Sequence, residues 1–125
     1  MRFSLLFFIA AQLVSGQTVL PDTPKFPGAT VTVTVPPIDP DGEFPLGTAR
    51  VCVDLKPQPQ CYTPPKEYGM NPSVSVIQVD KNTPALLFEV ESGGVTGYLI
   101  HLALLRPGPD GRLEDMLYRG DPLSN

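Results

Sequence analysis

The sequence predicts an all-β protein: an antiparallel β-sandwich or a partly open barrel of about six strands that follows a cleaved signal peptide. Three observations predict this fold class. Runs of alternating β-branched residues recur along the chain. Turn-forming residues separate these runs at intervals of about ten residues. The chain also has 16 prolines in 125 residues, and proline at this density disfavours helices.

The first sixteen residues have the pattern of an export signal. Arg2 provides a positive charge, an apolar run covers residues 5–13 with only Gln12 interrupting it, and small or modest side chains occupy residues 14–16. We expect cleavage between Gly16 and Gln17, and therefore a secreted or periplasmic protein. The run is shorter than the about 20 residues of a membrane-spanning helix. An uncleaved signal anchor is the alternative.

Removal of the leader changes the charge and the length of the chain. The full sequence has a net charge of −4. Loss of Arg2 leaves a net charge near −5 on about 109 residues, enough for one domain. An acidic chain lacks the positively charged surface that attracts the phosphates of a nucleic acid, so we expect no nucleic-acid partner. No second long apolar run follows, and we expect no membrane span in the mature chain.

The mature chain divides by composition into two parts. Residues 17–47 contain seven prolines and predict an extended segment with one strand, and residues 48–125 predict the β domain. The run Thr30–Val35 alternates threonine with valine and predicts a strand that ends at Pro36-Pro37. The chain stops soon after its last predicted strand, so we expect it to be a fragment of a longer protein.

The β domain is expected to contain five strands. The first covers residues 48–55 and places Cys52 on its more polar face; residues 56–72 are expected to be loop. A second strand, residues 73–80, changes faces at Val76-Ile77, which predicts a β-bulge there. Residues 85–91 and 95–105 flank Gly93-Gly94 and predict a hairpin. The part 98–105 is apolar on both faces, which suits a central strand or a buried helix. Residues 112–119 predict the last strand.

The two cysteines are expected to form one disulfide. The chain has two cysteines, Cys52 and Cys61, and an even number in an exported chain favours a disulfide. This bond would close a ten-residue loop. The disulfide serves either as a staple on an ordinary loop or as the base of a rigid display loop. The spacing lacks the Cys-x-x-Cys pattern of a redox pair, and two cysteines with one histidine do not complete a zinc site.

Candidate catalytic groups are few. His101 is the only histidine, and no serine of the mature chain lies in a Gly-x-Ser-x-Gly turn. Glu89 and Glu91 lie on one face of a predicted strand, where carboxylates can perform acid–base chemistry or simply face solvent. The segment 39–43 places three carboxylates at alternate positions, a partial calcium pattern that is also typical of turns. The sequence therefore predicts no catalytic residue, no metal site and no cofactor.

The best candidate for a binding site is the loop of residues 56–72, between the predicted strands 48–55 and 73–80. Tyr62, Lys66 and Tyr68 lie there, with the expected disulfide at the loop's base. Tyrosines on a stiff loop offer flat, amphipathic surface to a protein or a glycan. The alternative is that both rings pack against the edge of the sandwich.

Several segments resemble stretches of uncharacterised small secreted bacterial proteins. These segments are Gln60–Lys66, Ser92–Gly94, His101–Gly108 and Leu113–Asp115, so that the resemblance covers residues 50–115. Proteins of this kind have no established activity, and the resemblance assigns no functional residue. We therefore expect a secreted, non-catalytic protein with a structural or interaction role. The alternative is a small extracytoplasmic hydrolase, or the N-terminal fragment of a larger secreted protein.

Overall fold

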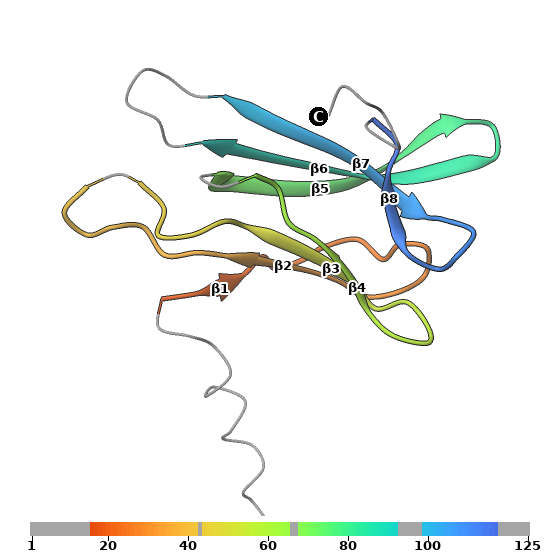
Figure 1. The fold of residues 1–125 in the computed structure, drawn as a ribbon, viewed down its shortest axis with the longest axis horizontal. Coiled ribbons are helices and arrows are strands. Elements are labelled where there is room, and N and C mark those ends of the chain that lie inside the picture. The colour runs from red at the N-terminus through yellow and green to blue at the C-terminus, as the bar shows by residue number, and fades with distance from the viewer. Residues whose placement is uncertain (1–15, 43, 66–67, 93–98, 118–125) are drawn as a thin grey trace, which may run out of the picture.

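Two antiparallel four-stranded sheets pack against each other (Figure 1). The computed structural model describes residues 16–42, 44–65, 68–92 and 99–117, and these contain no helix. The strands are β1 (Thr18–Val19), β2 (Val31–Val35), β3 (Arg50–Val53), β4 (Gln60–Tyr62), β5 (Tyr68–Asp80), β6 (Thr83–Ser92), β7 (Ile100–Pro107) and β8 (Leu113–Asp115). The all-β, sandwich-like prediction is confirmed, and the sheets are not closed into a barrel.

In each sheet, strands that follow one another along the chain are neighbours. The first sheet has the order β1-β2-β3-β4 and the second has the order β5-β6-β7-β8. Such meanders need only short connections, because antiparallel neighbours are joined by turns. Strands β1 and β2, from the proline-rich segment, therefore belong to the same sheet as β3 and β4.

Strict alternation places the apolar side chains of the first sheet between the two sheets. Val31 pairs with Val53 and Val33 pairs with Val51, and all four valines are buried. Thr32 pairs with Cys52 on the opposite face of this sheet, which faces outward. A β-branched residue suits this half-buried surface, since its stiff side chain packs well on a pleat.

The second sheet contributes the largest core side chains. Leu86 pairs with Leu105 and Phe88 with Ala103, on the central strands β6 and β7. Phe26, from the loop between β1 and β2, closes the core and is 2% exposed. The core consists of Phe26, Val31, Val33, Ala49, Val51, Val53, Leu86, Phe88, Val90, Ala103 and Leu105. Full burial of each large apolar side chain contributes about 1.5–3 kcal/mol.

The structure corrects the number and extent of the predicted strands. Strands β1 and β4, of two and three residues, were not predicted; β4 lies in the segment expected to be loop. Strand β5 begins at Tyr68 rather than at Ser73. Strand β7 settles the alternative between strand and buried helix in favour of strand. Strand β8 ends at Asp115, and the end of its predicted range lies outside the described residues.

The predicted bulge at Val76-Ile77 is wrong. Val76 pairs with Leu86 and Ile77 with Ala85 in regular register, and the register shifts lie nearer the two ends of β5. The apparent change of face has another cause. In this part of β5 the side chains on both faces are exposed. The positions of its apolar residues therefore do not indicate which face points toward the core.

Candidate functional site

Tyr62 and Tyr68 meet His101 at the seam between the two sheets. The Tyr62 ring, from β4, stacks on His101 of β7 with centroids 6.0 Å apart. The Tyr68 ring, from the start of β5, lies 5.3 Å from the same imidazole. Tyr62 also contacts the core, because its ring meets Phe88 edge-on at 6.2 Å. All three seam residues, Tyr62, Tyr68 and His101, are half-buried.

A hydrogen bond joins the two sheets at this seam. The hydroxyl oxygen of Tyr62 lies 2.6 Å from Nε2 of His101. Burial lowers the pKa of His101, and the nearby Asp115 carboxylate opposes this effect. The neutral imidazole is therefore favoured near neutral pH. With its proton on Nδ1, Nε2 accepts the hydrogen bond that the phenol donates.

The predicted binding set is placed only in part. Tyr62 and Tyr68 have the positions just given, and Lys66 lies outside the described residues. Both rings contact His101 and pack beside the core, and each keeps some exposed surface. That these residues bind a partner stays a prediction. No local sequence pattern indicates that His101 and Phe88 join the two tyrosines, because this contact depends on how the sheets pack.

The acidic pair on β6 does not converge with the histidine. Glu89 pairs with Leu102 and Glu91 with Ile100, whereas His101 pairs with Val90, which faces the core. Successive side chains of a strand point to opposite faces, so both carboxylates face outward and the imidazole inward. Nδ2 of Asn71 donates to Glu91 at 3.0 Å on that outer face.

Ser92, the serine nearest to His101 along the paired strands, already has a structural role. Its hydroxyl accepts a hydrogen bond from the backbone N–H of Leu99 at 3.2 Å, and its side chain is nearly buried. An activated nucleophile needs a base within hydrogen-bonding distance. The imidazole of His101 is instead hydrogen-bonded to the Tyr62 hydroxyl.

The predicted disulfide is present between Cys52 and Cys61. It crosslinks directly paired residues of β3 and β4 and lies on the outer side of the first sheet, as the alternation predicted. Such a bond is compatible with an oxidising compartment. The signal peptide predicted for residues 1–16 lies, apart from Gly16, outside the described residues.

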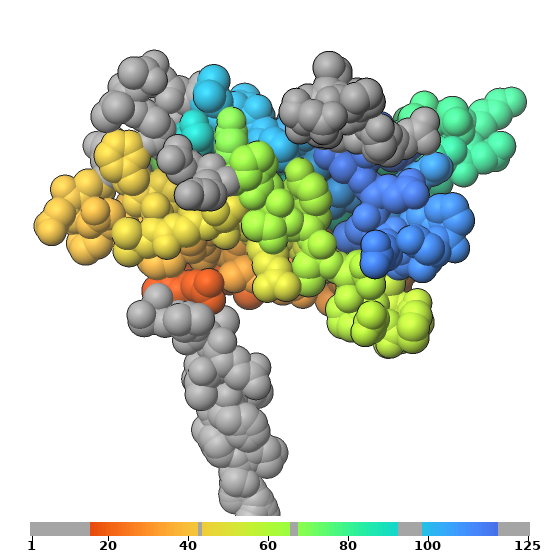
Figure 2. All heavy atoms as spheres, viewed as in Figure 1, coloured from red at the N-terminus to blue at the C-terminus, as the bar shows by residue number. Residues whose placement is uncertain are grey.

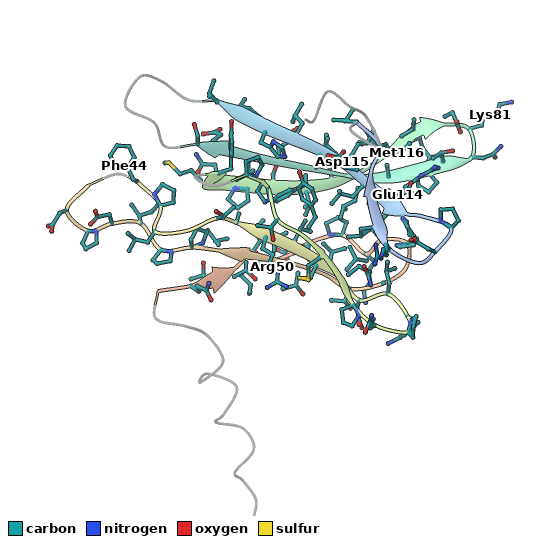
Figure 3. All side chains as sticks on the ribbon, viewed as in Figure 1. Phe44, Arg50, Lys81, Glu114, Asp115 and Met116 are labelled. Atoms are coloured by element: carbon teal, nitrogen blue, oxygen red, sulfur yellow. A yellow bond between two sulfur atoms is a disulfide. The ribbon has the colours of Figure 1, made fainter. Side chains whose placement is uncertain are left out.

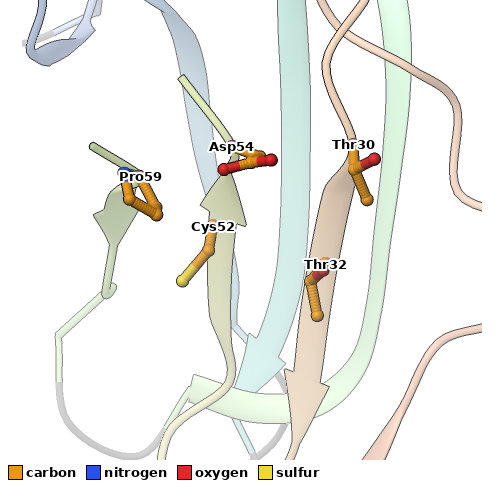
Figure 4. A pocket seen from close by; sticks show the side chains of 5 residues that line it. All are labelled: Thr30, Thr32, Cys52, Asp54 and Pro59. Carbon is orange, nitrogen blue, oxygen red and sulfur yellow. The ribbon is translucent and has the colours of Figure 1, made fainter. Parts of the chain in front are cut away.

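Beside the disulfide lies a shallow groove of about 320 Å³ (Figure 4). Its lining residues are Thr30, Thr32, Cys52, Asp54 and Pro59. Nζ of Lys56 lies 3.9 Å from the carboxylate of Asp54, which lines this groove. Both charged side chains are largely exposed, so their attraction contributes little to stability.

In the aspartate-rich turn at residues 39–43, a carboxylate accepts a hydrogen bond from the backbone of the turn itself. Oδ1 of Asp39 accepts from the N–H of Asp41 at 3.0 Å, a local bond that is typical of aspartate turns. Glu43, the third carboxylate of the calcium hypothesis, lies outside the described residues. Among the residues that are described, no group of three histidine, cysteine or acidic side chains could hold a metal ion.

The outer face of the second sheet carries an exposed apolar row along β7. Ile100 is 61% exposed and Leu102 is 41% exposed, while Leu104 continues the row half-buried. Glu91 and Glu89 lie beside the first two of these residues on β6. The apolar residues on both faces of 98–105 predict a central strand, which β7 is, and they are also the sequence signal for this exposed row.

The comparisons with known proteins assign no family. No protein-family model, no curated protein and no solved structure matches the chain. None of the described segments forms a helix of the length and apolarity that a membrane crossing requires.

Proposed function

We propose that this chain is an exported, non-catalytic β-sandwich protein that acts by binding a protein partner through the outer face of its second sheet. The observation that carries the proposal is the apolar row of Ile100, Leu102 and Leu104. Large side chains exposed together on a sheet face are typical of interaction surfaces. The row is aliphatic, which favours a protein partner over a glycan.

The charges beside the row define the partner further. Glu89 and Glu91 flank the apolar residues on the same face. A partner surface that places basic side chains around an apolar centre would complement them. The surface of Tyr62 and Tyr68 that remains exposed at the seam is a second place where such a partner or a glycan could contact the chain.

The surroundings of His101 support the non-catalytic part of the proposal. The imidazole is hydrogen-bonded to the Tyr62 phenol, stacks on that ring and contacts the tilted ring of Tyr68, and the outward Glu89 and Glu91 lie on the other side of the sheet. A hydrolase would need a nucleophile or a pair of carboxylates directed at one point. The direct test is an assay of the purified chain on chromogenic esters and glycosides. Turnover that the His101→Asn substitution abolishes would overturn the non-catalytic assignment.

The binding part is tested by photo-crosslinking in the cells that produce the protein. A photoreactive residue replaces Leu102, and a matched one replaces Val19, which is 49% exposed on β1 of the other sheet. We expect a discrete heavier adduct from position 102 and none from position 19. Ile100→Asp should abolish the adduct. Equal labelling from both positions, or none from position 102, would contradict the proposal.

A further inference from the structure

Strand β5 forms a long free edge of the second sheet. It is the outermost strand, next to β6, and it runs for 13 residues from Tyr68 to Asp80. Among the described residues, a backbone hydrogen bond from outside the hairpin reaches only its beginning, where the backbone oxygen of Tyr68 accepts from the N–H of Ala49. From Ser73 to Val79, no described segment other than β6 donates a backbone hydrogen bond to the strand or accepts one from it.

This free edge lacks the usual protection against pairing. Natural edge strands carry lysine or proline, are short, or are covered by another segment. Residues 73–79 contain neither a charge nor a proline. Val76, Ile77 and Val79 are 42%, 37% and 42% exposed. The tip of the hairpin of β5 and β6 projects from the body of the molecule (Figures 1 and 2).

We propose that the β5 edge pairs with the β5 edge of a second copy of this chain, antiparallel about a two-fold axis near Val76. Antiparallel pairing about that axis places Ser75 of one copy opposite Ile77 of the other, and Ser73 opposite Val79. Each pair shares a face of the sheet, and no charge opposes a like charge. The product is one continuous eight-stranded sheet.

Charge complementarity favours a second copy as the occupant and also sets the register. Lys81 lies at the tip of the hairpin (Figure 3). In this register the turn that carries Lys81 of the second copy lies beside the irregular start of β5, where the Asn71 amide is bonded to the Glu91 carboxylate. The ammonium group then comes within reach of Glu91, and the two-fold axis repeats the contact. Asp80 lies at the same end of the contact, beyond a second shift of register.

The test measures the mass of the purified protein by sedimentation velocity over a range of concentrations. We expect a monomer–dimer equilibrium. Val76→Lys brings two ammonium groups together at the axis and should weaken the dimer about ten-fold or more. Val19→Lys is the matched control, because it changes an equally exposed valine on an edge strand of the other sheet; it should leave the equilibrium unchanged.

A charge exchange tests the register. Lys81→Glu should weaken the dimer about three- to ten-fold, and the double variant Lys81→Glu/Glu91→Lys should restore it. Lys81 lies in an exposed turn, so this variant keeps its fold even if Val76→Lys does not. A monomer at all concentrations would overturn the proposal, and so would a dimer that both variants leave intact. A dimer that only Leu102→Lys dissociates would instead place the contact on the outer face of the sheet, as in the proposed function.

Discussion

The contact of Tyr62 with His101 and Phe88 leads to the most direct stability prediction. Tyr62→Ala removes a half-buried ring at the seam, and Tyr62→Phe removes only the hydroxyl that bonds Nε2 of His101. Loss of a fully buried aromatic ring costs about 3–5 kcal/mol, so about 2 kcal/mol is expected for a half-buried ring. The hydrogen bond contributes about 1 kcal/mol.

We therefore expect Tyr62→Ala to lower the free energy of unfolding by about 3 kcal/mol and Tyr62→Phe by about 1 kcal/mol. Urea unfolding followed by circular dichroism measures both, since the chain has no tryptophan to report by fluorescence. Tyr68→Phe is the control: its hydroxyl has no hydrogen bond within the described residues, and its cost should stay below about 0.5 kcal/mol.

A cost of less than about 1 kcal/mol for Tyr62→Ala would refute the reasoning, because the ring would then not hold the sheets together. Equal effects of Tyr62→Ala and Tyr62→Phe would refute the division between packing and hydrogen bonding. The same variants bear on the predicted binding role of Tyr62. A variant that loses a partner but keeps its stability would assign the ring to binding rather than to the seam.

Three further predictions follow from other parts of the fold. Replacement of Cys52 and Cys61 by alanine should lower the free energy of unfolding by about 2.7 kcal/mol, from the chain entropy of the short closed loop, as measured in urea; an unchanged midpoint would contradict this. Because burial lowers the pKa of His101 in the folded state, the unfolded state binds more protons as the pH falls through about 6.5, so the melting temperature should fall from pH 7 to pH 5. His101→Asn should remove this part of the pH dependence, and an identical pH profile would show that other groups cause it. Gly69→Ala would place a Cβ 2.6 Å from the backbone oxygen of Gly47 and should cost about 1–3 kcal/mol, whereas Gly47→Ala, whose nearest neighbour is 3.4 Å away, should cost less in the same thermal melt.

Strand β2 could be predicted from the sequence because one of its faces is the core. Val31, Val33 and Val35 alternate with threonines because water lies on one side of β2 and the other sheet lies on the other, and the period of two is then visible. Strand β4 was missed because Gln60–Tyr62 is short and lies beside several prolines. What makes it a strand is its crosslinked pairing with β3, which is a tertiary contact.

The candidate site was predictable in its parts and not in its assembly. Tyr62 and Tyr68 could be selected because tyrosines near a disulfide offer contact surface. The histidine that joins them lies 39 residues beyond Tyr62 in the sequence. Its position depends on the packing of the sheets, which no local pattern encodes. The start of β5 was expected to be loop because Gly69, Asn71 and Pro72 are residue types that favour loops. The strand nevertheless continues through them, with shifts of register and a positive φ of 49° at Asn71.

The lengths of the edge strands explain why the proposed association should stop at a dimer. The first sheet ends in β1 and β4, of two and three residues, and the second ends at one side in β8, also of three residues. Such short edges offer few unpaired backbone groups to another chain. Strand β5, with 13 residues, is the longest edge strand among the described strands. A two-fold axis uses the β5 edge of both copies at once and leaves neither β5 edge for a third copy, whereas a head-to-tail contact would need two different edges and would continue into a fibre. Association that grows beyond two copies would therefore show that some surface other than β5 forms the contact.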